Sequence, residues 1–173
     1  MYKRLLVPID GGELSDRAIQ ASIDLAVQLG ASITGFVAEK APPLAAGRRQ
    51  RDSGEAALVA QEALTSAQAS QVLQQFEARA IDAGVPFEAF RLRATRVSRA
   101  IIEAAESRGC DLILMVTHGR GAFGEFLYGS ETKAVLADCK LPLLILKDPR
   151  RQGRPAPGAP DLAPEAGDPV GAP

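Results

Sequence analysis

The chain has 173 residues, of which 46% are hydrophobic and 24% are charged, and its formal net charge is −1. This length suits one domain with a sizeable core, and the composition is typical of a globular protein. The near-neutral charge argues against a broad electrostatic surface for nucleic acid or anionic lipid, and no apolar run reaches membrane-spanning length. Because no leader-like apolar stretch precedes the first predicted strand, we expect a cytoplasmic protein. Cys110 and Cys139 lack metal-ligand spacing, so we expect small, reduced, buried thiols.

Short apolar runs alternate with stretches of helical periodicity along the chain. In chain order the predicted elements are a strand (3–10), a helix (15–29), a strand (31–38), a surface loop (41–54), a helix (55–83), a strand (85–94), a helix (97–109), a strand (110–116), a glycine-rich turn into a helix near 130, and a strand (141–147). Such alternation is typical of an α/β fold with a doubly wound parallel sheet and helices on both faces.

The composition changes sharply after residue 147. The segment 148–173 holds seven of the twelve prolines and few large apolar residues. It therefore buries too little surface to offset the entropy that ordering would cost. We predict one domain over 1–147 followed by a Pro-rich disordered tail over 148–173.

A glycine-rich stretch, THGRGAFGEFLYGSETKAVL at 117–136, follows the fourth predicted strand and runs into a helix. Backbone N–H groups at a helix N-terminus favour an anion, and glycines let the backbone approach it closely. Ser130 stands where an N-cap residue belongs, so its hydroxyl can serve the helix or a phosphate oxygen. The stretch matches neither the Walker pattern nor the dinucleotide GxGxxG. From these residues alone, a phosphate cradle and a plain strand-to-helix connector both stay open.

The order of the residues resembles the universal stress protein family from residue 2 to about residue 147. VPIDGGELSDRAIQASIDLA is similar to the family's first strand and helix, and DLILMVTHGRGAFGEFLYGSETKAVL followed by LPLLILK is similar to its closing signature. The nucleotide-binding branch carries Gly, two residues, Gly, nine residues, Gly and then Ser or Thr. Gly119, Gly129 and Ser130 match that spacing, whereas Val116 stands where the first glycine belongs.

The resemblance implies a five-stranded sheet in the order 3-2-1-4-5 and a site for ATP or AMP, which Mg²⁺ can accompany. It implies contacts to adenine or ribose from Asp10 and Val37. It also implies phosphate-side contacts from Gly119, Gly129, Ser130 and Thr132. The remaining predicted nucleotide-binding residues are Pro8, Val116, Arg120 and Glu131.

Fold topology supports the same place for the site. In an open α/β sheet, ligands bind beyond the carboxyl ends of the strands, where the strand order reverses. In the implied order the first and fourth strands are neighbours there, so Asp10 and the stretch 116–130 would face one crevice. Asp10 also has a purely structural interpretation, as a turn residue ahead of two glycines. Arg120 can neutralise phosphate or be a solvated side chain, and His118, the single histidine, is favoured as a loop residue rather than a catalytic one.

The expected function is adenine-nucleotide binding by a stress-response sensor or signalling adaptor, with at most slow ATP hydrolysis. The resemblance also implies a homodimer built on the apolar edge strand 141–147. The branched side chain of Val116 supports an alternative, a nucleotide-free homodimeric scaffold. A minor alternative is an adenylating enzyme, because DGGELS at 10–15 is partly similar to the SGGxDS loop of ATP-dependent ligases. Asp10 and Leu14 depart from that loop.

Overall fold

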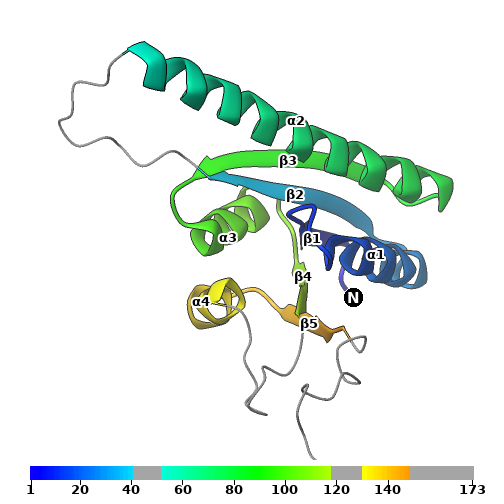
Figure 1. Cartoon of the computed structure of the whole chain (residues 1–173). Helices are drawn as coiled ribbons and strands as arrows, with labels where there is room; N and C mark the ends of the chain where they lie inside the picture. The colour runs from blue at the N-terminus through cyan, green and yellow to red at the C-terminus, as the bar shows by residue number, and fades with distance from the viewer. Residues whose placement is uncertain (41–51, 118–129, 149–173) are drawn as a thin grey trace, which may run out of the picture.

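A computed structural model describes residues 1–40, 52–117 and 130–148 (Figure 1). The side chains of residues 40 and 52–65 are not described. Several predictions therefore lie outside the described residues: most of the loop 41–54, the disordered tail beyond residue 148, and the roles of His118, Gly119, Arg120 and Gly129.

The described elements follow the predicted alternation of strands and helices. In chain order they are β1 (Arg4–Pro8), α1 (Ser15–Leu29), β2 (Ser32–Lys40), α2 (Asp52–Asp82), β3 (Phe87–Ala94), α3 (Val97–Ser107), β4 (Leu112–Thr117), α4 (Ser130–Asp138) and β5 (Leu143–Lys147). Helix α2 begins at Asp52, inside the predicted loop 41–54, so that loop prediction was too long at its carboxyl end. The other elements lie within a few residues of their predicted bounds.

The five strands form one parallel sheet in the order β3-β2-β1-β4-β5, which confirms the predicted topology. Strand β1 is at the centre, and its first neighbours β2 and β4 are far from each other in sequence. β1 ends at Pro8, where it pairs with Phe36 of β2. Strand β2 continues to Lys40 and β4 continues to Thr117. The central strand is thus shorter than its neighbours at the carboxyl edge of the sheet.

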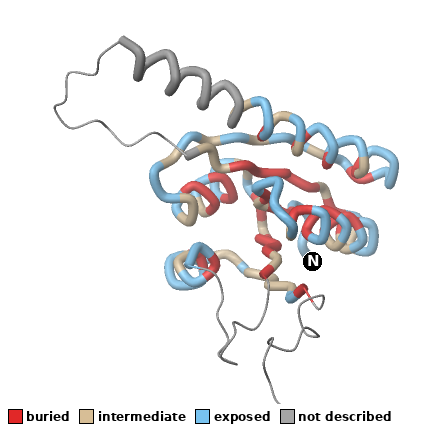
Figure 2. Tube along the Cα trace, viewed as in Figure 1, coloured by how far each residue is buried: buried red, intermediate tan, exposed pale blue. Residues whose placement is uncertain are grey.

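Helices cover both faces of the sheet, and each face has its own apolar core. Helices α1 and α2 pack on one face through residues such as Ile19, Ile23, Leu73 and Phe76. Helices α3 and α4 pack on the other through Ile101 and neighbouring small side chains and through Val135. Figure 2 shows the buried positions concentrated along the central strands and on the inward sides of these helices. The apolar strands are therefore shielded on both faces, as parallel sheets require.

A glycine in β2 lets α2 approach the sheet closely. The Phe76 and Phe87 rings pack with centroids 4.8 Å apart and an interplanar angle of 57°. A Cβ atom on Gly35 would lie 2.5 Å from Phe87 and 3.0 Å from Phe76. Since real Cβ contacts are not that short, this close packing requires glycine at position 35.

At the amino-terminal edge of the sheet, Asp111, which precedes β4, binds the start of β1. Its Oδ2 and Oδ1 accept hydrogen bonds from the backbone N–H groups of Lys3 and Arg4, at 2.8 and 2.9 Å. Residue 111 therefore caps β1, and β4 starts at Leu112 rather than at the predicted 110. Cys110 is buried, as expected, and this burial raises the pKa of its thiol, while Cys139 is half-buried.

The described chain continues one residue past the predicted domain boundary. Asp148 is buried, and its backbone N–H donates to the carbonyl oxygen of Thr117 at 2.9 Å. This bond joins the end of β5 to the end of β4. Within the described ranges, no helix has both the length and the apolar character needed to cross a membrane.

Candidate functional site

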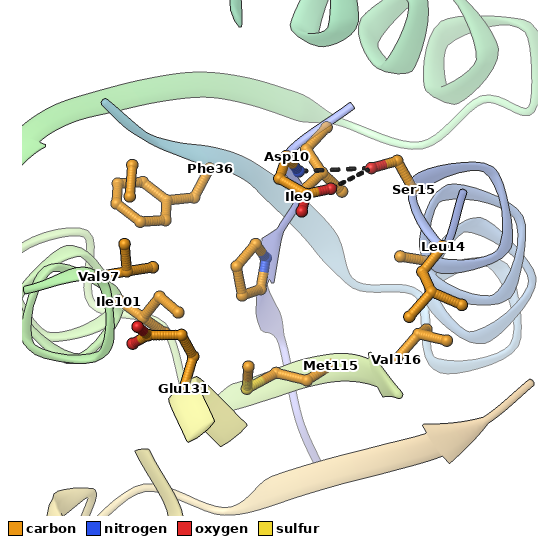
Figure 3. A pocket seen from close by; sticks show the side chains of 13 residues that line it. Ile9, Asp10, Leu14, Ser15, Phe36, Val97, Ile101, Met115, Val116 and Glu131 are labelled. Atoms are coloured by element: carbon orange, nitrogen blue, oxygen red, sulfur yellow. Dashed lines mark hydrogen bonds between the residues drawn. The ribbon is translucent and has the colours of Figure 1, made fainter. Parts of the chain in front are cut away.

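A cleft opens where β1 stops short of its neighbours. It has a volume of about 330 Å³, within the range of small-molecule sites. Its lining comes from β1, the β1–α1 turn, α1, β2, α3, β4 and α4, as Figure 3 shows. The lining residues are Pro8, Ile9, Asp10, Leu14, Ser15, Ala18, Phe36, Ala38, Val97, Ile101, Met115, Val116 and Glu131. The cleft thus lies at the switch point of the sheet, where the topology places a ligand site.

Hydrogen bonds around Ser15 fix the β1–α1 turn on one side of the cleft. The buried hydroxyl of Ser15 accepts from the backbone N–H groups of Asp10 and Gly11, at 3.3 and 2.9 Å, and donates to Asp10 Oδ1 at 3.2 Å. The same Oδ1 accepts from the N–H of Gly12 at 2.8 Å. Gly11 has φ of 78°, which favours glycine. Asp10 therefore has the structural role in the turn that its sequence context suggested, and its carboxylate also lines the cleft.

The inner wall of the cleft is apolar and lies on the face of the sheet that α3 and α4 cover. Phe36, Val97, Ile101 and Met115 contribute side chains (Figure 3). Most of these side chains are at least nine-tenths buried. A flat apolar ligand such as a purine ring suits a wall of this kind.

The strand period separates Val37 from the cleft. The Val37 side chain packs into the core under α1 and α2, while Phe36 and Ala38 on either side line the cleft. The Phe36 carbonyl oxygen accepts from the N–H of Ile9 at 2.9 Å. In a strand, alternate residues direct their backbone N–H and C=O groups to the same side. After Phe36, the next residue of β2 with backbone groups on the β1 side is therefore Ala38, and it lies beyond the end of β1. Ala38 therefore lines the cleft and the Val37 side chain does not, while the contact of Val37 to adenine or ribose stays a prediction.

The first turn of α4 supplies the remaining predicted residues that are described. Ser130 begins the helix and is exposed, whereas Thr132 is buried with 5% of its surface accessible. Thr132 does not line the cleft. Glu131 does, and its Oε2 accepts a hydrogen bond from the backbone N–H of Ser98 in the first turn of α3, at 2.9 Å. Val116, at the end of β4, also lines the cleft.

The structure brings four of the predicted site residues together in the lining of the cleft, namely Pro8, Asp10, Val116 and Glu131, whereas Val37, Ser130 and Thr132 do not line it. Gly119, Arg120 and Gly129 lie outside the described residues. The sequence analysis did not predict the other lining residues, which are Ile9, Leu14, Ser15, Ala18, Phe36, Ala38, Val97, Ile101 and Met115. Of these residues, only Ser15 had an indication in the sequence, as the serine at the end of the DGGELS motif at 10–15. Among residues 1–40, 52–117 and 130–148, no group of three or more His, Cys, Asp or Glu side chains is arranged to hold a metal ion.

Comparison with known proteins places the chain in a family. A family model described as the universal stress protein family matches residues 1–147. The chain belongs to the universal stress protein family. A universal stress protein of Methanocaldococcus jannaschii is 26% identical over 152 residues, which cover 88% of this chain and 86% of the relative.

Solved structures of universal stress proteins share the fold. One, in complex with cAMP, superposes with a TM-score of 0.60 at 21% identity, covering 84% of this chain and 97% of the other. Another, from Archaeoglobus fulgidus in complex with dAMP, has a TM-score of 0.57 at 16% identity, covering 84% and 98%. At these identities the likeness establishes the fold of this universal stress protein domain.

Proposed function

We propose that this universal stress protein binds an adenine nucleotide, ATP or AMP, in the cleft between β1, β2 and β4. The observation that carries the proposal is the position of the cleft, at the carboxyl end of a central strand that stops short of both neighbours. Two family members of the same fold are in complex with cAMP and dAMP. The apolar wall suits the base, and the backbone N–H and carbonyl oxygen of Ala38 would present a donor and an acceptor to the base edge.

The phosphate side of the proposed site is the amino end of α4. Backbone N–H groups there lack helical partners and favour an anion. Ser130 is the first residue of α4 and is exposed, so its hydroxyl is accessible to a phosphate oxygen. The family's sequence spacing implies phosphate contacts from Gly119 and Gly129 as well. Mg²⁺ would accompany the phosphates of ATP.

The proposed biological role is that of a cytoplasmic sensor or adaptor that reports nucleotide occupancy to partners during stress. We further propose a homodimer formed through β5. This strand is at the edge of the sheet, and Leu143, Leu144, Ile145 and Leu146 are all partly exposed. An apolar edge strand pairs readily with another chain.

The test is calorimetric titration of the purified full chain with AMP and with Mg²⁺-ATP. We expect micromolar binding of at least one of them, and a loss of at least about tenfold in the double variant Gly129→Ala, Ser130→Ala, because one charge-assisted hydrogen bond contributes that much. Ser107→Ala, at the far end of α3, is the matched control and should bind like the parent chain. No heat with up to millimolar nucleotide would contradict the proposal.

A nucleotide-free homodimeric scaffold is the second candidate, because Val116 lines the cleft with a branched side chain. If the cleft binds nucleotide, Val116→Gly should tighten binding by removing bulk beside the ligand, at some cost in the stability of β4. Titration of both proteins, with sedimentation to record the oligomeric state, checks this. A dimer in which neither protein binds nucleotide would favour the scaffold.

A further inference from the structure

The carboxylate of Glu131 occupies a position that an anionic ligand group would otherwise favour. It comes from the first turn of α4, and its Oε2 accepts the backbone N–H of Ser98, the second residue of α3, at 2.9 Å. The amino end of a helix carries partial positive charge and unpaired N–H groups, so it attracts anions. The chain therefore already supplies its own anion to the amino end of α3.

The same side chain also lies at the amino end of its own helix. Glu131 is the acidic residue in the first turn of α4. A carboxylate there offsets the positive end of the helix dipole. Two of the three helices whose amino ends line the cleft, α3 and α4, thus have one acidic side chain in common at those ends.

The rest of the described lining adds negative charge. Asp10 lines the cleft on the side of β1 and α1, across from Glu131 (Figure 3). Among the described residues, no lysine or arginine lines the cleft. The charged side chains among the described lining residues are therefore the carboxylates of Asp10 and Glu131, so this described lining is acidic.

We infer that Glu131 makes this cleft select adenine nucleotides of low phosphate charge, so that AMP binds more tightly than ATP. The inference rests on the proposed function and names the ligand class of that same site. Each phosphate beyond the first adds negative charge near the carboxylate, while the base and ribose contacts stay the same. Affinity should therefore fall from AMP to ADP to ATP when no divalent cation is present to neutralise them.

The experiment compares Glu131→Gln with the parent chain by titration of AMP and ATP in buffer with EDTA. Glutamine is nearly isosteric and its amide oxygen still accepts from Ser98, so α3 keeps its hydrogen bond while the negative charge is removed. Because AMP and ATP carry the same base, any effect of the substitution on base recognition cancels in the ratio of their affinities. We expect this ratio to favour AMP in the parent chain and to shift toward ATP by about three- to tenfold in the variant.

The matched control is Asp138→Asn, which makes the same charge change at the exposed carboxyl end of α4. Its affinity ratio should equal that of the parent chain. A parent chain that prefers ATP without Mg²⁺, or a ratio that Glu131→Gln leaves unchanged, overturns the inference and leaves the proposed function standing. Absence of binding by any adenine nucleotide overturns the proposed function, and the inference with it.

Discussion

Replacing Phe76 by alanine should lower the free energy of unfolding by about 3–5 kcal/mol, the usual cost of removing a buried aromatic ring. The Phe76 side chain has no exposed surface and packs at 4.8 Å from the ring of Phe87. It fills the space that Gly35 leaves between α2 and β2, so the neighbouring backbone cannot collapse far into the cavity. Chemical denaturation of the parent chain and the variant, with a shared m-value, measures the difference.

Gln75→Ala is the matched control for this change. Gln75 is exposed on the same helix turn, and its truncation should alter the free energy of unfolding by no more than about 0.5 kcal/mol. A loss below about 1 kcal/mol for Phe76→Ala would mean that α2 is not packed on the sheet as described.

Enlarging Ala38 to leucine should weaken adenine-nucleotide binding by at least about tenfold, because the added atoms enter the cleft beside the inner wall. The fold should tolerate the change, with a shift in unfolding free energy of about 1 kcal/mol or less, since this side chain is only partly buried and borders the cleft at the edge of the core. Titration with AMP and denaturation of the same samples give the two quantities.

Val37→Ala is the matched variant on the opposite face of β2. It should lower the free energy of unfolding by about 2 kcal/mol, because two buried methyl groups are removed from the core under α1 and α2, and leave the affinity for AMP unchanged within about twofold. If instead Val37→Ala weakens binding and Ala38→Leu does not, the side-chain assignment of β2 to the two faces is wrong.

The sequence was sufficient for the fold because hydrophobic periodicity is local and strong. The buried strands β1 and β4 are short apolar runs, and α1 and α3 carry apolar residues at helical spacing. Element ends were harder to predict. Residues 110 and 111 adjoin an apolar run and were therefore predicted as strand. In the structure the Asp111 carboxylate instead accepts hydrogen bonds from the start of β1, more than 100 positions away in sequence. Such long-range hydrogen bonds have no local signature.

The candidate site was predictable where the family pattern fixes positions, and less so where geometry decides. Asp10 follows β1 by two residues and lines the cleft, while its contact to the nucleotide stays a prediction. Val37 shows the limit, because a strand turns successive side chains to opposite faces, and the family pattern alone did not show that the Val37 side chain is in the core while Ala38 lines the cleft. The hydrogen bond of Glu131 to α3 was not predictable, since it depends on how two helices pack.

The early end of β1 also bears on how far such proteins can diverge in sequence. Beyond Pro8, the main chain of β2 has no neighbour from β1, so a ligand edge could pair with the backbone N–H and carbonyl oxygen of Ala38 much as another strand would. Recognition by peptide groups depends on backbone position and is largely indifferent to side-chain identity. Selection could then preserve the length of the central strand while most residues around it change.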